Sequence, residues 1–255
     1  MTLNYYLISN HTLNFNIIDF KVIGFVFFST LFTYNFQRLL KIKLKINLTG
    51  ERVEWINSHG YIIYSITLIS FLVSIYFGLY FISKVWILFV LSGFISFFYV
   101  WKIPLLKGKN LRDIPGIKIY LIAFVWVVIC VIMPFLLDSN IDYTSLSILS
   151  TSLFLFMVAI TIPFDIRDIK LDDSSKKTIP QLIGIHKSVY LSIGLLVISQ
   201  ITLQLLLPFN FGIWIFTIIG IITLLSAKKP QEELFYSGII DGLLIIQIVL
   251  IWGFV

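Results

Sequence analysis

Charged side chains are scarce in this sequence. Asp, Glu, Lys and Arg make up 13% of its 255 residues, whereas 58% are hydrophobic and the mean hydropathy is +0.97. Soluble domains carry about 25% charged residues. Because so few side chains favour water, the composition excludes an ordinary soluble domain and indicates a protein that is largely embedded in a membrane.

Cysteine and histidine are also too few to build a site of their own. The single cysteine, Cys130, lies inside an apolar run, which excludes an internal disulfide and a cysteine-based metal centre. The three histidines are scattered, at positions 11, 59 and 186. The sequence has no glycine-rich phosphate loop, no Ser/His/Asp set and no nucleic-acid motif. Carboxylates are the remaining ligands to consider for a metal.

Long apolar runs recur along the whole chain. Runs of about 18 or more apolar residues are typical of membrane-spanning helices, and they lack the alternation of lipid-facing β-strands. Residues 188–227 carry no charge, and the segment "LPFNFG", Leu207 to Gly212, divides them with a tight hairpin. The sequence predicts an all-α, polytopic membrane helix bundle of about eight transmembrane helices, at residues 18–36, 60–80, 84–100, 116–137, 144–164, 188–207, 211–227 and 235–255.

The basic residues gather on one predicted side of the membrane. Loops 37–59, 101–118, 165–187 and 228–234 hold 17 of the 19 Lys and Arg residues, and the other side holds Lys21 and Lys84. The positive-inside rule places the basic loops in the cytoplasm. The net charge of +6 therefore reflects topology rather than nucleic-acid binding. We expect an integral multi-pass protein of a bacterial plasma membrane.

A charged stretch follows the fifth predicted span: "FDIRDIKLDDSSKKTIPQLIG", Phe164 to Gly184. Asp165, Asp168 and Asp172 are spaced i, i+3 and i+7, which places them on one helical face. Three such carboxylates repel one another unless cations separate them, and Mg²⁺ takes oxygen ligands that it shares with phosphates. One interpretation is a magnesium site at the membrane edge; the other is a solvated loop of mixed charge.

The two halves of the chain show a weak internal match. When "YNFQRLLKIK" is set over "PFDIRDIKLD" without gaps, Arg38 matches Arg167 and Lys41 matches Lys170. Both segments follow a predicted span and enter the cytoplasm. Because membrane folds often contain internal repeats, we expect a single domain over residues 1–255 with pseudo-repeated halves, roughly 1–137 and 138–255.

These residues resemble motifs of the UbiA superfamily of intramembrane prenyltransferases. The aspartates match its second motif, D-x-x-D-x-x-x-D, and "KKTIPQLIG" is similar to the K-T-[IL]-P-x-x-x-G that follows it. Tyr34 and Asn35 resemble the start of the first motif. The segment from Phe97 to Lys118 resembles a loop of the family that contains a tyrosine followed by basic residues. The resemblance implies nine helices around a cavity open to the cytoplasm and to lipid. The present chain would lack most of the first helix.

The resemblance also implies a reaction, transfer of an isoprenyl group from a polyprenyl diphosphate to an aromatic or other lipid acceptor. It makes Asp165, Asp168 and Asp172 the catalytic residues and the ligands of Mg²⁺. It implies membrane lipid and isoprenyl diphosphate as partners, and no nucleic acid. The residues expected to bind the substrate are Asn35, Arg38, Tyr99, Lys102, Lys107, Arg167 and Lys177.

The first motif departs from the family pattern. Phe36, Leu39 and Lys43 occupy its three aspartate positions, and Asn35 alone remains. One magnesium site is therefore expected rather than two, with Arg38 or Lys43 neutralising the other phosphate. Two alternatives stay open: a non-catalytic protein that binds a prenyl lipid or assists membrane complex assembly, and a transporter.

Overall fold

The computed structural model describes residues 20–43, 60–106, 108–137, 142–170 and 172–254, and within these ranges the chain is helical, without β-strands. It forms two compact units. The first comprises the described residues up to Leu111, and the second begins at Arg112. This division does not coincide with the predicted halves, whose duplication stays a prediction.

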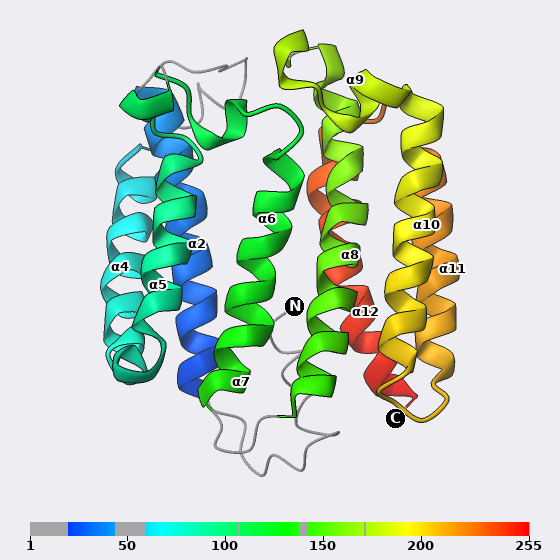
Figure 1. The fold of residues 1–255 in the computed structure, drawn as a ribbon, viewed down its shortest axis with the longest axis horizontal. Helices are drawn as coiled ribbons and strands as arrows, with labels where there is room; N and C mark the ends of the chain where they lie inside the picture. Colours follow the sequence, from blue (N-terminus) through cyan, green and yellow to red (C-terminus); the bar gives the residue numbers. More distant parts are fainter. Residues whose placement is uncertain (1–19, 44–59, 107, 138–141, 171, 255) are drawn as a thin grey trace. The chain divides into compact units, whose positions relative to one another are not determined.

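The described residues of the first unit include three long helices (Figure 1): α2 (Phe20–Lys43), α4 (Gly60–Gly78) and α5 (Ile82–Phe98). A short 3₁₀ turn follows at η1 (Pro104–Leu106), and another, η2 (Leu111–Asp113), includes the last residue of this unit and the first residues of the second. Helix α2 packs along α4. Aromatic rings fill this unit, and Phe36 stacks on Phe32 and Phe97 with ring centroids 5.5 Å and 6.3 Å apart. Phe36, which occupies an aspartate position of the first motif, is therefore part of an apolar cluster.

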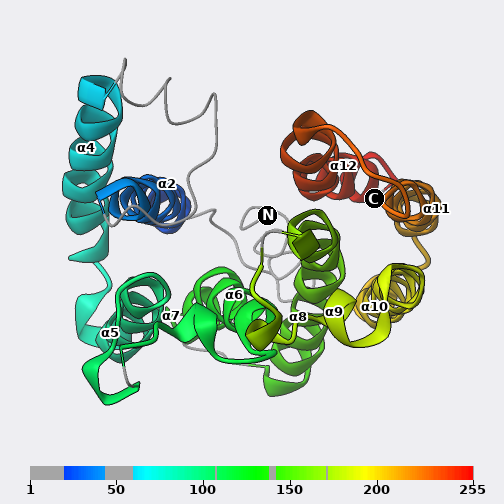
Figure 2. The same ribbon diagram turned by 90° about the horizontal axis from the view of Figure 1, so that it is seen from above.

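The second unit is built around α8 (Tyr143–Arg167). Helix α8 packs against α6 (Lys118–Val127) and α10 (Ile185–Gln204), as Figure 2 shows, and α11 (Phe211–Ser226) packs against α10 and α12 (Asp241–Gly253). A π-helical segment, η3 (Val128–Ile132), joins α6 to α7 (Met133–Leu137), and another, η6 (Phe235–Ile240), leads into α12. The short elements η4 (Asp168–Lys170), η5 (Ser174–Lys176) and α9 (Ile179–Ile183) connect α8 to α10.

Local chemistry defines the ends and the packing of α8. Asp142 caps its start, because the carboxylate accepts hydrogen bonds from the backbone N–H of Thr144 at 3.0 Å and of Ser145 at 3.3 Å. Pro163 lies inside the helix and has no N–H, so it cannot donate the usual helical hydrogen bond to the carbonyl of Ala159, four residues earlier. The Ser192 hydroxyl of α10 donates to that Ala159 carbonyl at 2.6 Å. The bond that proline removes is thus replaced by one that joins α8 to α10.

Polar side chains also join the helices inside the second unit. Ser152 and Ser199 each donate a hydroxyl hydrogen bond to the backbone carbonyl of the other, at 3.0 Å and 2.8 Å. Gln247 of α12 donates to the Gln200 side chain of α10 at 3.1 Å. All four residues are at most 1% exposed. Because unpaired polar groups are costly in an apolar interior, these bonds favour one arrangement of α8, α10 and α12.

Among the residues that the structure describes, five helical segments are long and apolar enough to cross a membrane: Gly60–Gly78, Lys118–Leu137, Tyr143–Lys170, Ile185–Gln204 and Phe235–Gly253. They confirm the prediction of a helical membrane bundle. Two further apolar helices, Ser83–Phe98 and Phe211–Ser226, are shorter. A helix of 16 residues rises about 24 Å, less than the ~30 Å hydrocarbon core, so the count of eight spans stays a prediction.

Candidate functional site

The candidate site lies where α8 ends. Helix α8 stops at Arg167, and the chain continues through the 3₁₀ turn η4. Asp165 stands in the last turn of α8 and is 2% exposed, and Asp172, beyond η4, is 8% exposed. The alternative interpretation of a solvated loop is therefore wrong for these two side chains. Burial of a charge requires partners.

The partners of both carboxylates are cationic side chains. Lys118, the first residue of α6, places its Nζ 2.5 Å from Asp165 Oδ1 and 3.5 Å from Asp172 Oδ2. Asp172 Oδ1 also lies 2.7 Å from Lys176 Nζ and 3.6 Å from the Arg112 guanidinium. We call Arg112, Lys118, Asp165, Asp172 and Lys176 the Lys118 cluster. Its three cations and two carboxylates sum to a net charge of +1.

Backbone contacts hold the loops that carry these side chains. The Gly116 N–H donates to the Lys176 carbonyl at 2.9 Å, and Gly116 has a φ of 73°, which favours glycine. The Gln181 side chain donates to the Asp172 carbonyl at 3.1 Å and accepts from the Thr178 N–H at 3.0 Å. The loop before α6 is thereby joined to the loop after α8.

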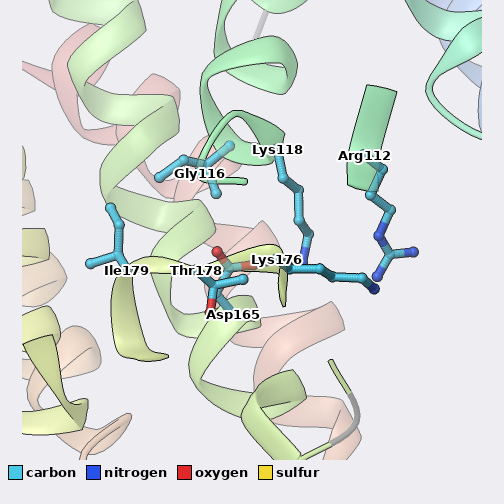
Figure 3. A pocket seen from close by; sticks show the side chains of 8 residues that line it. Arg112, Gly116, Lys118, Asp165, Lys176, Thr178 and Ile179 are labelled. Carbon is cyan, nitrogen blue, oxygen red and sulfur yellow. Dashed lines mark hydrogen bonds and ion pairs between the residues drawn. The ribbon is translucent and has the colours of Figure 1, made fainter. Parts of the chain in front are cut away.

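A small pocket opens beside the Lys118 cluster (Figure 3). Lys118 points toward Asp165, and Arg112 and Lys176 approach from neighbouring loops. The cavity measures about 10 Å³, which is room for about one water molecule. Its remaining lining residues are Gly116, Ile119, Thr178 and Ile179. A larger anion therefore requires the Arg112 and Lys176 side chains, 18% and 12% exposed, to move outward.

Asp168 forms its ion pair elsewhere. Arg167 binds it through two hydrogen bonds, Nε to Oδ1 at 2.7 Å and a terminal nitrogen to Oδ2 at 3.3 Å. The same guanidinium donates to Glu233 at 3.1 Å and lies over the rings of Phe164 and Tyr236, 5.3 Å from each centroid. The structure thus brings Asp165 and Asp172 together on Lys118, whereas Asp168 is paired with Arg167.

The other residues that the resemblance singled out lie outside the Lys118 cluster. In the first unit, the Asn35 side chain donates to the Leu31 carbonyl at 2.8 Å, and Arg38 donates to the Tyr34 hydroxyl at 3.1 Å. Tyr99 is half-buried at the end of α5, and Lys102 is exposed. In the second unit, Lys177 is exposed, with a left-handed φ of 45°. Lys107 lies outside the described residues.

The present arrangement does not fit a magnesium ion on the three aspartates. Mg²⁺ requires close oxygen ligands at about 2.0–2.1 Å in near-octahedral geometry. Asp165 Oδ1 and both oxygens of Asp172 are paired with ammonium and guanidinium groups. Within the part of the chain that the structure describes, no three His, Cys, Asp or Glu side chains come together as metal ligands.

Three members of the Lys118 cluster lie in the segments that resemble the family but were not among the expected site residues: Arg112, Lys118 and Lys176. They were visible as basic residues of the predicted cytoplasmic loops. The signal for Lys118 is its position at the first residue of an otherwise uncharged apolar run. A lysine there is typical of a membrane edge, so its role as a carboxylate partner becomes apparent from the fold alone.

The surroundings of Asp172 lower the pKa of its carboxyl group. Burial raises this pKa, but the hydrogen bond from Lys176 and the positive charges of Lys118, Lys176 and Arg112 together lower it below the ordinary value. An opposite charge within a few ångströms favours the ionised form. Asp172 therefore stays ionised to a lower pH than an ordinary aspartate.

Replacing Asp172 by asparagine should destabilise the protein at neutral pH, by about 2 kcal/mol, because charged hydrogen bonds are lost. An unfolded aspartate titrates at about 3.9, and the folded-state pKa is lower. The contribution of Asp172 is therefore full above about pH 4 and is lost as the pH falls through the folded-state pKa. Thermal unfolding in detergent at pH 7 and at about pH 3 measures this difference.

Asp173→Asn is the matched control, because Asp173 is exposed and caps η5, and asparagine caps equally well. A difference between wild type and Asp172→Asn that persists unchanged at low pH would contradict the assignment.

No family model, no curated protein and no solved structure matched this chain in the three comparisons.

Proposed function

We propose that this protein binds the phosphorylated head of an isoprenyl lipid at the Lys118 cluster and transfers the isoprenyl group to an acceptor held in the membrane. The observation that carries the proposal is the buried ionic cluster at the end of the long apolar helix α8. Such a position offers hydrocarbon to an isoprenoid tail and cationic groups to its phosphates.

The proposed reaction uses few groups of the protein. The C–O bond between the isoprenyl carbon and the diphosphate breaks, and its electron pair leaves with the diphosphate. The allylic cation forms a new C–C bond to an electron-rich aromatic acceptor, and the proton that the acceptor carbon loses passes to the departing diphosphate. Arg112, Lys118 and Lys176 would stabilise the charge on the leaving group, and the apolar helices would keep water from the cation.

Two sequence features support the proposal. The second motif, with its "KKTIPQLIG" tail, resembles that of the UbiA superfamily over a stretch that includes Asp165 and Asp172. The concentration of basic residues in loops 101–118 and 165–187 favours a cytoplasmic location for the site, where water-soluble diphosphate is released.

A second function has its own support. Phe36 stands at a position of the first aspartate motif and stacks on Phe32 and Phe97, so that this position packs against rings instead of carrying charge. A protein with one charged motif is suited to bind a prenyl lipid without reacting it. We propose this binding role as the alternative to transfer.

Release of diphosphate separates the two functions. Purified protein in lipid nanodiscs is incubated with geranyl diphosphate and with longer isoprenyl diphosphates, each with a set of phenolic acceptors, in Mg²⁺ and in EDTA. Transfer predicts diphosphate release and a prenylated acceptor. Saturable binding without release supports the lipid-binding role, and absence of both binding and release contradicts both proposals.

A further inference from the structure

The ammonium group of Lys118 lies between Asp165 and Asp172, where the resemblance to the UbiA superfamily leads us to expect a metal ion. This group touches one oxygen of Asp165 and one of Asp172, from two segments that are 47 and 54 residues away in the chain. Both carboxylates are buried, and Lys118 is 9% exposed. A lysine in this place supplies a fixed positive charge between two carboxylates, and this is the electrostatic part of what a bridging cation would supply.

The Lys118 cluster has more positive than negative charge, and it has donors that face the pocket. After the two carboxylates are paired, a net charge of +1 remains. Arg112 Nε is buried and makes no hydrogen bond to any described residue, and Arg112 lines the pocket. Buried donors are nearly always satisfied in native proteins. An acceptor-rich anion in the pocket would satisfy this donor.

We infer that Lys118 replaces the divalent cation, and that the Lys118 cluster binds the phosphate groups of an isoprenyl lipid without a metal ion. The identity of the ligand rests on the proposed function, whereas the independence from metal rests on the cluster itself. Arg112, the most exposed cation of the cluster, and Lys176, which lies in the loop after α8, turn outward and grip the phosphate oxygens. Lys118 stays between Asp165 and Asp172.

Calorimetry tests this inference with the full chain in detergent. Inorganic diphosphate and geranyl diphosphate are titrated into the protein in EDTA and in Mg²⁺. The expected result is binding of equal strength in both buffers, and tighter binding of geranyl diphosphate, because its tail adds apolar contact. Binding that disappears in EDTA overturns the inference. Binding of inorganic diphosphate alone overturns the assignment of a lipid ligand.

Two substitutions locate the site. Arg112→Gln removes a charged donor and leaves the Lys118–Asp165 pair intact, so affinity in EDTA should fall about tenfold, as expected for one charged hydrogen bond. The control is Lys187→Gln, which removes an equal charge from an exposed position outside the cluster and should leave affinity unchanged. Equal affinity of wild type and Arg112→Gln overturns the inference.

In the Lys118→Ala variant, diphosphate binding should respond to metal in the opposite way to wild type. Removing the ammonium exposes the facing oxygens of Asp165 and Asp172, so diphosphate binding should become dependent on Mg²⁺. This variant is extracted with Mg²⁺ present, because its carboxylates otherwise lack a partner. If it does not fold, the comparison of EDTA with Mg²⁺ in wild type and in Arg112→Gln still decides the matter.

The outcomes also separate this inference from the proposed function. Binding in EDTA without diphosphate release supports the metal-free site and contradicts transfer. Diphosphate release that requires Mg²⁺ supports transfer and contradicts the metal-free site.

Discussion

Replacing Lys118 by methionine should destabilise the protein by about 3–5 kcal/mol, the usual result of removing one partner from a buried ion pair. Methionine keeps most of the apolar stem but leaves Asp165, 2% exposed, without its 2.5 Å ion pair to Lys118. Asp172 is less affected, since Lys176 and Arg112 remain beside it. Thermal unfolding of the purified protein in detergent at pH 7 and in EDTA measures the loss.

The double variant Lys118→Met with Asp165→Asn is the matched control. It removes both charges, and replacing a whole buried pair is often neutral or stabilising. Most of the stability lost in Lys118→Met should therefore return. If the double variant is as unstable as the single one, then an unpaired charge on Asp165 is not the cause of the loss, and the stabilising role of the Lys118–Asp165 pair is contradicted.

Replacing Gly212 by alanine should also have a large effect, a loss of about 3 kcal/mol, as for severe overpacking. Gly212 is the second residue of α11, where this helix meets the end of α12. A methyl group there would overlap the backbone oxygen of Leu250, and it would lie 2.6 Å from the Leu250 carbonyl carbon. Because these are backbone atoms, no side-chain rotation relieves the overlap, and α11 has to move away from α12.

This movement would also strain the cap of α11. Asn210 Oδ1 accepts from the Ile213 N–H at 3.3 Å, while its Nδ2 donates to the Ile251 carbonyl at 3.0 Å. The two helices are thus joined through Asn210 next to the close approach at Gly212. Thermal unfolding of the purified protein in detergent measures the loss.

Gly194→Ala is the matched control for Gly212→Ala. Gly194 lies within α10, and no atom lies within 4 Å of the place that its methyl group would take. Alanine in a helix interior is more favourable than glycine by about 0.5–1 kcal/mol. The control should therefore be neutral or slightly stabilising. Equal destabilisation by both substitutions would contradict the role of backbone contact at Gly212.

Much of the helical architecture followed from local patterns. The segment Leu207 to Gly212 was predicted to divide a long apolar run, and the structure ends α10 at Gln204 and begins α11 at Phe211. The predicted spans at residues 144–164 and 116–137 coincide with α8 and with the continuous segment from α6 to α7. Apolar length and breaker residues are local signals, so they can be recognised without knowledge of the fold.

The prediction that the three aspartates share one helical face is wrong for Asp172, which lies beyond the end of α8. Spacing along an α-helix assumes that the helix continues, but α8 ends at Arg167 and the chain turns at η4. Asp172 is therefore placed by the loop, where Gln181 holds its backbone carbonyl. Asp165 and Asp172 still meet, because both reach the ammonium of Lys118.

The sequence by itself determined that this chain is helical and suited to a membrane, because the length and composition of apolar runs are properties of each segment. The tertiary structure alone decided which charges are paired. Lys118 and Asp165 are 47 residues apart, and no spacing rule connects residues so distant. Their pairing follows from the packing of α6 against α8, which buries both groups at one junction, where neither charge is stable without the other.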